Sequence, residues 1–404
     1  MSLMETKNIK DVFNGLTQSN TGKFTRPNGK LEKDRYGKPV FVPHKLPVKV
    51  RYDRETVMLL ANAERKVGEL KGIGAVLENP HILIRAYLKK EAVLSSKIEG
   101  TLASLKDLNR QEAVGSIKKN DAENLRLQEV INYVCALEES LNTLQTSEQH
   151  VDLELLKKAH KKLMEGVRGH DKNPGNFRSQ QNWIIKTHRS VQEIVYTPPP
   201  PKKIPTLLEN LEEFIQADHK ELSVLVQCAI IHYQFEAIHP FLDGNGRIGR
   251  LMLPLMLHKK DVLPEPLLYL SAYFDLHREQ YYSGLLAVSQ KSRWNDWIKF
   301  FLKAFTEQAG ETIDSIQKLR MLMTKYKKTL HEKNSSSNSI FLMEHLFANP
   351  YVTIPHAAEF LNITYPSAKN AVMALVESGI LKQTPIRYKS KVFVAQEIEK
   401  TLNV

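Results

Sequence analysis

The segment HPFLDGNGRIGR, residues 239 to 250, combines the side-chain types of a phosphate-transfer site over a short stretch. Gly244, Asn245 and Gly246 stand where a loop enters the helix-like run RIGRLMLPLML. Successive backbone N–H groups there can form an anion-holding nest at a helix N-terminus. Phosphate is the anion that we expect such a nest to bind.

Charged and titratable side chains surround this nest. Arg247 and Arg250 are three residues apart, so they share one face of the helix and can reach the same polyphosphate. Asp243 offers a hard oxygen ligand to Mg²⁺, which usually bridges one carboxylate to substrate phosphates. The imidazole of His239 can take a proton from a hydroxyl near neutral pH. Together these groups predict nucleotide-dependent group transfer.

Each part of the segment also has a simpler interpretation. A lone Gly-x-Gly is usually a turn, a lone His is usually structural, and the whole string could be a polar loop between helices. The coincidence of several functional groups in order favours the site. A P-loop does not fit, because no Gly-Lys-Ser/Thr follows the glycines, and a kinase glycine-rich loop does not fit a loop that enters a helix.

The segment resembles the signature of the Fic family, His-x-Phe-x-(Asp/Glu)-Gly-Asn-(Gly/Lys)-Arg-x-x-Arg, and every defined position matches. The resemblance extends to PGNFRSQQNWI at 174 to 184, to a proline-rich stretch at 189 to 204 and to REQYYSGLL at 278 to 286. It implies an α-helical enzyme that moves AMP from ATP onto a Ser, Thr or Tyr hydroxyl of a protein and releases pyrophosphate. The cofactors implied are ATP and Mg²⁺.

The resemblance also implies a role for each residue of the signature. His239 would activate the target hydroxyl, Asp243 would carry Mg²⁺, Gly244, Asn245 and Gly246 would line an anion hole, Arg247 would face the inner phosphates, and Arg250 would face the γ-phosphate. Lys in place of Gly246 marks the kinase-like branch of the family, so Gly favours AMP transfer. An enzyme that transfers phosphate or phosphocholine is the alternative.

Two further groups of residues could complete the site. Tyr281 and Tyr282 would help to close the nucleotide pocket, or else belong to the core. Ile194, Val195 and Tyr196 precede four prolines, which predicts an exposed hairpin or flap rather than core, because proline lacks the N–H that a helix or central strand needs. This flap would receive the target as an added strand, or else be a plain surface loop.

A second motif, SSKIEGT at 95 to 101, ends a helix-like run, with Gly100 as the expected C-cap. Ser95 and Glu99 are four apart and share a helix face. The motif resembles the inhibitory sequence of the same family, (Ser/Thr)-x-x-x-Glu-(Gly/Asn). We expect Glu99 to pair with Arg250 and to exclude the γ-phosphate. The alternative is a solvated glutamate at a helix end, and removal of AMP by a water that Glu99 positions stays open.

Helical periodicity dominates from about residue 55 to 333 and predicts a mainly α fold, a Fic-type helical core with a β-hairpin flap. The last 65 or so residues resemble a winged helix, three short helices followed by two strands around a basic turn. The expected parts are an irregular basic arm (1–54), an N-terminal helical segment with the inhibitory helix (55–110), the catalytic core (111–310), a helical spacer and linker (311–339) and the winged-helix-like domain (340–404).

Composition narrows the class of protein. The chain has 404 residues, two cysteines and no apolar run long enough to span a membrane, so we expect a cytoplasmic protein. The formal charge of +12 invites a nucleic-acid interpretation, but residues 335 to 404 are nearly neutral. Arg387, Lys389 and Lys391 cluster near the wing. A DNA-binding regulator with a nucleotide-sensing core therefore remains an alternative, and the tail could also serve a homodimer.

Overall fold

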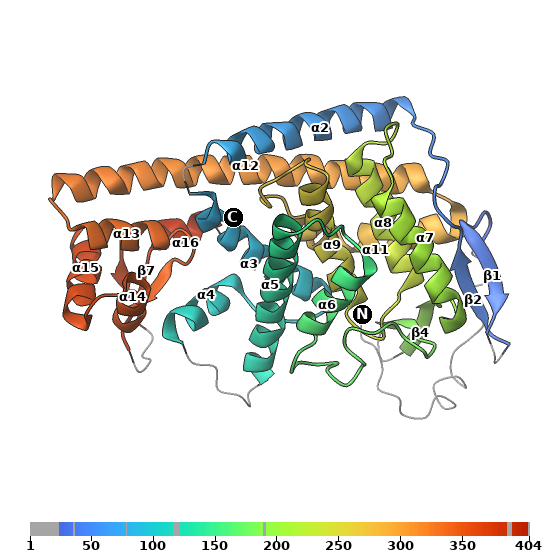
Figure 1. The fold of residues 1–404 in the computed structure, drawn as a ribbon, viewed down its shortest axis with the longest axis horizontal. Helices are drawn as coiled ribbons and strands as arrows, with labels where there is room; N and C mark the ends of the chain where they lie inside the picture. The colour runs from blue at the N-terminus through green and yellow to red at the C-terminus, as the bar shows by residue number, and fades with distance from the viewer. Residues whose placement is uncertain are drawn as a thin grey trace.

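Helices make up most of the protein in the computed structural model, which confirms the predicted mainly α class (Figure 1). The structure describes residues 24–34, 37–77, 79–115, 122–188, 191–385 and 390–402. The helices of the body are α2 (Arg54–Ala75), α3 (Pro80–Ile98), α4 (Leu105–Val114), α5 (Ala122–Thr146), α6 (Leu153–Leu163), α7 (Ile204–Gln216), α8 (Val224–Ile238), α9 (Asn245–Lys259), α10 (Ser271–Leu276), α11 (Arg278–Lys291) and α12 (Trp294–Glu332). No helix in these ranges is apolar over enough of its length to cross a membrane.

Helices α8 and α9 form the centre of the body, and nearly every residue of both is buried. Helices α7, α11 and α12 pack on α8, while α3, α5 and α6 pack on α9. A helix that is apolar on all sides is stable only when other elements surround it, as here. The residues between α8 and α9 are therefore held by the best-packed part of the molecule.

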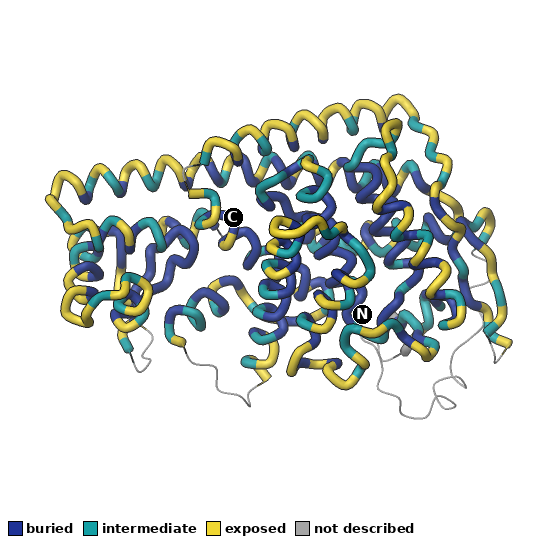
Figure 2. Tube along the Cα trace, viewed as in Figure 1, coloured by how far each residue is buried: buried dark blue, intermediate teal, exposed yellow. Residues whose placement is uncertain are grey.

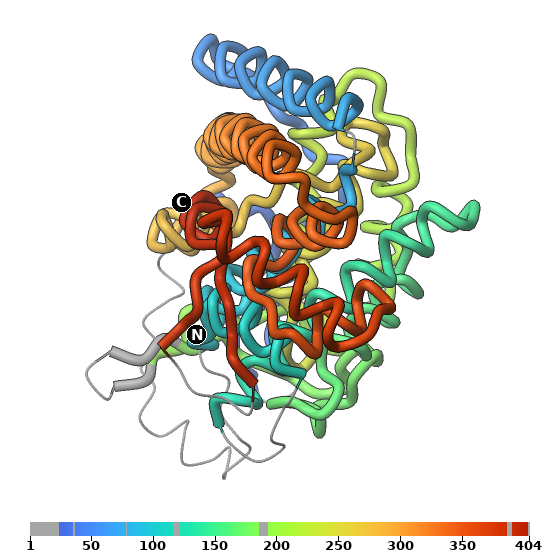
Figure 3. The backbone as a smooth tube through the Cα atoms, turned by 90° about the vertical axis from the view of Figure 1, so that its left-hand side faces the viewer, coloured from blue at the N-terminus to red at the C-terminus, as the bar shows by residue number. Residues whose placement is uncertain are grey.

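Helix α12 is 39 residues long and joins the body to the C-terminal unit. Helix α2 lies alongside it in both ribbon views (Figures 1 and 3), and the outer faces of both helices are exposed (Figure 2). The inner face of α12 buries Trp297, Phe301, Ile316 and Leu330. The buried residues thus form one apolar face along α12, and this face packs against the rest of the molecule.

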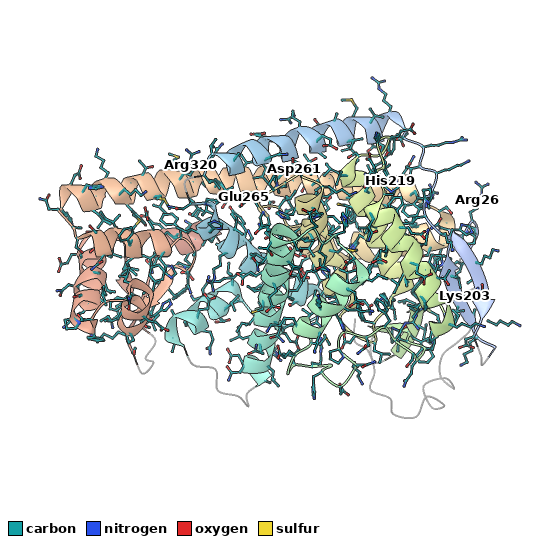
Figure 4. All side chains as sticks on the ribbon, in the orientation of Figure 1. Arg26, Lys203, His219, Asp261, Glu265 and Arg320 are labelled. Atoms are coloured by element: carbon teal, nitrogen blue, oxygen red, sulfur yellow. The ribbon has the colours of Figure 1, made fainter. Side chains whose placement is uncertain are left out.

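The predicted irregular arm is wrong for residues 29–43, whereas residues 24–28 and 44–53 form no helix or strand and residues 1–23 lie outside the described ranges. Strands β1 (Gly29–Lys33) and β2 (Pro39–Pro43) pair as an antiparallel hairpin. Phe41 is 1% exposed, and its backbone N donates to the Thr197 carbonyl oxygen at 2.9 Å. Alternation in PVFVP supplies the buried face, which the many Lys, Gly and Pro residues around it concealed. At this end of the molecule, Lys203 (labelled in Figure 4) pairs with Glu32 of β1 at 3.2 Å.

The predicted linker at 334–339 is wrong in part. Only Lys333, Asn334, Ser335 and Ser336 connect α12 to α13 (Ser337–His345). The Ser336 side chain caps α13 by accepting from the backbone N of Ser339. Serine is a preferred N-cap as well as a common linker residue, so composition alone could not separate the two roles.

The C-terminal unit contains α13, β5 (Tyr351–Thr353), α14 (Ile354–Leu361), α15 (Tyr365–Glu377), β6 (Lys382–Gln383), β7 (Val392–Val394) and α16 (Gln396–Leu402). Its strands form one antiparallel sheet in the order β5-β7-β6. Strand β5 and helix α16 were not expected, because elements this short show no sequence period. Arg387 and Lys389 lie outside the described residues, and Lys391 is exposed.

Trp297 provides a test of the packing of α12 on α8. It is 1% exposed, and its indole N–H donates to the Ala229 carbonyl oxygen at 2.8 Å. We expect Trp297→Ala to lower the free energy of unfolding by about 3–5 kcal/mol, because it leaves a large cavity. Met321 on the same helix is 74% exposed, so Met321→Ala should change stability by less than about 0.5 kcal/mol. Chemical denaturation measures both, and equal effects would contradict this packing.

Candidate active site

A tight corner joins α8 to α9 and carries the residues of the signature. His239 caps α8 with φ of 52°, and its backbone N donates to the Phe235 carbonyl oxygen at 2.9 Å. Gly244 precedes α9 with φ of 78°. A Cβ on Gly244 would lie 3.1 Å from the sulfur of Met164, so a side chain is disfavoured by space as well as by the left-handed backbone. The chain therefore reverses within six residues.

The side chain of Asn245 closes this corner. Its Oδ1 accepts from the backbone N of Phe241 at 2.8 Å, and its Nδ2 donates to the Phe241 carbonyl oxygen at 2.9 Å. Asn182 donates to the same carbonyl at 3.0 Å. The sequence assigned Asn245 to the anion hole, but its amide is committed to the loop. Only its backbone, in the first turn of α9, is in a position to contribute to anion binding.

Arg178 anchors the corner from the opposite side. Its guanidinium donates to the carbonyl oxygens of His239 at 2.8 Å, Gln180 at 3.0 Å and Pro199 at 2.6 Å. The expectation that the proline-rich stretch is exposed is wrong, because Pro198, Pro199 and Pro200 are buried. Proline lacks a backbone donor but keeps its carbonyl, and a buried arginine can use that acceptor.

His160 of α6 is a site residue that the sequence did not reveal. Its ring stacks on Phe241, with centroids 3.8 Å apart and planes 8° apart. Its Nδ1 accepts from the backbone N of Gly175 at 2.8 Å, so Nε2 carries the hydrogen and donates to the Asp243 carbonyl oxygen at 3.0 Å. Burial lowers the pKa of His160 to about 4. In the sequence it falls in an ordinary amphipathic helix, so no local signal marks it.

The imidazole of His239 is a suitable proton acceptor. Its side chain is 12% exposed, and Nδ1 lies 3.3 Å from the Glu236 carbonyl oxygen, which assigns the hydrogen to Nδ1 and leaves Nε2 its lone pair. Burial, helped by the positive charge of Arg178, lowers the pKa of His239 to about 4. The ring is therefore neutral near neutral pH and able to take a proton.

Arg247 has unused hydrogen-bonding capacity. It is 1% exposed, and within the described residues its Nε and Nη1 have no hydrogen-bond partner. The nearest carboxylate oxygens, on Glu129 and Asp243, are each 3.9 Å away. Buried donors without acceptors are costly, so this guanidinium is prepared for an anion that enters beside α9.

Asp243 is the only acidic side chain of the signature. Its Oδ1 accepts from the backbone N of Gly244 at 2.7 Å, and the side chain is about one-fifth exposed. A Cβ on Gly169 would lie 3.0 Å from Oδ2, so the glycine leaves room beside this oxygen. The described ranges hold no group of three or more metal-ligating side chains. This donor set fits Mg²⁺ that arrives with a nucleotide rather than a metal bound by protein alone.

Arg250 and Glu99 form an ion pair in the structure. Arg250 Nη2 donates to Glu99 Oε1 at 2.9 Å and to the Ser95 carbonyl oxygen at 3.0 Å, and Nε donates to Ser95 Oγ at 2.9 Å. Burial alone would lower the pKa of Arg250, but the Glu99 carboxylate raises it. For Glu99, burial alone would raise the pKa, but Arg250 holds it below its usual value. Both groups are therefore charged.

The Glu99 carboxylate also covers the first turn of α9. A Cβ on Gly246 would lie 2.2 Å from Glu99 Oε1, so only glycine allows this approach. Helix α3 ends at Ile98 with Glu99 as its C-cap, whereas Gly100 was expected in that position. Gly100 follows with φ of 92° and turns the chain away. Glu99 thus pairs with the arginine that the resemblance assigned to the γ-phosphate.

The two tyrosines differ in position. Tyr281 is 1% exposed, and its hydroxyl bonds His232 Nε2 at 2.8 Å within an aromatic cluster, so it belongs to the core. Tyr282 is half-buried and close enough to Glu99 and Arg250 for their charges to act on its hydroxyl.

The predicted flap is a two-stranded hairpin of β3 (Ile184–His188) and β4 (Val191–Tyr196). The Tyr196 side chain is buried, and its hydroxyl donates to the Ala237 carbonyl oxygen at 2.8 Å, so it anchors the hairpin instead of facing a target. Ile194 and Val195 remain partly exposed.

Comparison with known proteins agrees with this geometry. Residues 150–257 match the Fic/DOC family, and residues 57–142 match the Fic/DOC family N-terminal region. A probable protein adenylyltransferase of Aquifex aeolicus is 26% identical over 220 residues, which cover 52% of this chain and 62% of that protein. The protein adenylyltransferase Fic of Drosophila melanogaster is 33% identical over 70 residues, which cover 17% and 14%. The chain thus spans less than two thirds of these relatives.

Two solved structures share the fold. A Fic family protein from Desulfovibrio desulfuricans G20 superposes with a TM-score of 0.56 at 20% identity, over 86% of this chain and 98% of that chain. Fic-1 from C. elegans superposes with a TM-score of 0.51 at 19% identity, over 65% and 74%. The chain therefore shares the fold of these Fic proteins, and two of its segments are similar to the Fic/DOC family and its N-terminal region.

The pKa of His160 predicts how stability depends on pH. The folded state keeps the ring neutral down to about pH 4, whereas the unfolded chain protonates it near pH 6.5, so stability falls as the pH drops between these values. In His160→Gln this fall should be smaller by up to about 1.4 kcal/mol per pH unit. Urea denaturation across this range measures the slope. Identical slopes in both proteins would show that His160 is not held neutral.

Proposed function

We propose that this chain is a protein adenylyltransferase that moves AMP from ATP to a hydroxyl side chain of a target protein. One observation carries the proposal. Two fully buried arginines, Arg247 and Arg250, have N–H groups without a partner among the described residues, in the first turns of α9 and next to the neutral imidazole of His239. This arrangement fits a triphosphate whose α-phosphorus is attacked by a hydroxyl.

The proposed reaction has one bond formed and one broken. The hydroxyl oxygen of the target attacks the α-phosphorus, the bond to the pyrophosphate oxygen breaks, and His239 Nε2 takes the hydroxyl proton. Backbone N–H groups at the start of α9 and the Arg247 guanidinium stabilise the charge on the phosphates. Asp243 would hold Mg²⁺, which neutralises phosphate charge when it is bound.

We further propose that Glu99 inhibits this reaction. Its carboxylate takes a donor of Arg250 and lies over Gly246, so a γ-phosphate at the same place would meet a like charge and an occupied partner. A charge-assisted contact of this kind contributes a few kcal/mol, which corresponds to a rate effect of roughly 10²-fold.

Target binding is proposed at the β3–β4 hairpin. A strand of the target would add to its edge through main-chain hydrogen bonds, near Ile194 and Val195. This mode holds a hydroxyl near His239 without requiring a particular target sequence.

Removal of the Glu99 carboxylate tests the inhibition. We expect Glu99→Gly to raise the incorporation of labelled AMP about 10- to 100-fold at saturating ATP, because Arg250 then becomes available to the γ-phosphate. Glu99→Gln keeps the shape and removes the charge, so its activity should lie between the two. Equal incorporation in all three proteins would contradict the inhibitory role.

A second substitution tests the role of His239, and a mass measurement tests which group is transferred. His239→Ala, added to Glu99→Gly, should abolish incorporation while ATP still binds, because the base acts on the chemical step. Intact-mass measurement separates the addition of AMP from the addition of phosphate. A phosphate mass in the Glu99→Gly protein would overturn AMP transfer and favour the alternative group.

DNA contact by the C-terminal unit is the second candidate function. The order of α13, β5, α14, α15, β6 and β7 supports a winged helix, in which α15 would be the recognition helix. Ser367, Lys369 and Asn370 lie on its exposed face. These side chains can bond phosphates and base edges.

Binding to duplex DNA across a range of salt concentrations tests this candidate. True contact should weaken steeply with salt, and Lys369→Ala should reduce the slope of log affinity against log salt by about 1. Absence of salt-dependent binding would assign the unit to protein contacts instead.

A further inference from the structure

Glu236 is a buried carboxyl group for which neither the signature nor the inhibitory motif provides a role. It lies in the last turn of α8, three residues before His239, and its side chain is 10% exposed. Its Oε2 is 3.9 Å from His239 Nδ1, while its backbone oxygen lies 3.3 Å from the same nitrogen. The residue thus meets the catalytic ring on the side opposite to the proton-accepting Nε2.

The neighbouring helix α9 leaves space for the carboxyl group of Glu236. A Cβ on Gly249 of α9 would lie 2.5 Å from Glu236 Oε1, so the glycine makes the space that this oxygen fills. Within the described residues Oε1 is buried and has no hydrogen-bond partner. A buried acceptor without a donor is costly, and such groups are retained where they have a function.

Charged and titratable groups face Glu236 from several elements. Arg250 of α9, Glu99 at the end of α3, Tyr281 of α11 and Tyr196 of β4 all interact with its charge. Arg250 is already paired with Glu99, so this pair offers Glu236 little net charge. Burial therefore raises the pKa of Glu236 to about 8, with a smaller lowering by Arg250 and a raising by Glu99.

We propose that Glu236 is a positioning residue for His239: its backbone oxygen accepts from Nδ1 and orients the imidazole, and its side chain, as a carboxylate, stabilises the imidazolium that forms when His239 takes the target's proton. The proposal rests on the proposed function. The proton of the hydroxyl goes to Nε2, the hydrogen on Nδ1 stays in place, and Glu236 takes no proton. A negative charge 3.9 Å from a new positive charge in a buried site is strongly favourable.

The pH dependence follows from this role. Glu236 is a neutral acid below its pKa and gives the imidazolium little support there, so the rate should rise as Glu236 ionises. In the Glu99→Gly background the midpoint should lie no higher than about 8, because the carboxylate that raises the pKa of Glu236 is gone. In the same background, Glu236→Gln should lose this rise and lower kcat about 10-fold or more, with little change in KM for ATP.

Two further variants separate positioning from folding. Glu236→Asp keeps the charge, so it should retain the rise with pH at a lower kcat. Glu213 of α7 is exposed, and Glu213→Gln should match the parent enzyme. If Glu236→Gln keeps the rise with pH, or changes only the melting temperature, the proposal is overturned.

A measurement without catalysis keeps this inference apart from the proposed function. In protein with isotope-labelled histidine, the His239 ring signals should show a step between about pH 6 and pH 9 as Glu236 ionises, since interacting groups titrate together. The step should vanish in Glu236→Gln. If no target protein incorporates AMP, the proposed transferase activity is refuted but the coupling of Glu236 to His239 is not. If the step is missing in the parent protein, that coupling is refuted.

Discussion

The burial of Arg250 is the constraint around which the catalytic end of the molecule is arranged. A guanidinium that is 1% exposed must have acceptors and a negative charge, because a buried charge without them would be too costly. Within the described residues its hydrogen-bond partners are Ser95 of α3 and Glu99, which caps that helix. The packing of α3 against α9 thus satisfies the same guanidinium that a γ-phosphate would require, so in the proposed function inhibition and substrate binding would compete for one charge.

A second constraint is the corner between α8 and α9. The left-handed backbone of His239 is unfavourable for a residue with a side chain, whereas Gly244 adopts it readily. The conformation persists because Asn245, Arg178 and His160 bond the backbone around it. The imidazole of His239 therefore sits on a segment that is short, buried and fully tied to its neighbours. Catalytic groups need this precision, because small displacements of a base are costly to the rate.

Helix α3, which ends next to Glu99, also contacts the C-terminal unit. Lys89 of α3 is 1% exposed, pairs with Glu112 of α4 and donates to the Ala348 carbonyl oxygen at 3.3 Å. Asn349 donates to Glu112 Oε2 at 2.9 Å. The C-terminal unit is thus attached through a buried polar network as well as through α12. Helix α3 is consequently held at its C-terminal end by Arg250 and at its middle, through Lys89, by the C-terminal unit.

Local chemistry was readable in the sequence, because a helix N-terminus and the face of a helix depend only on near neighbours. The helical class, the start of α9 directly after Gly244 and the shared face of Ser95 and Glu99 follow from such spacing. The roles of His160, Arg178 and Glu236 do not, since each acts on residues that only folding brings beside it. The proline-rich stretch shows the same limit. Its missing N–H groups predicted exposure, but Pro198, Pro199 and Pro200 are buried in the tertiary structure. There Arg178 binds the Pro199 carbonyl and Gln181 binds the Pro198 carbonyl.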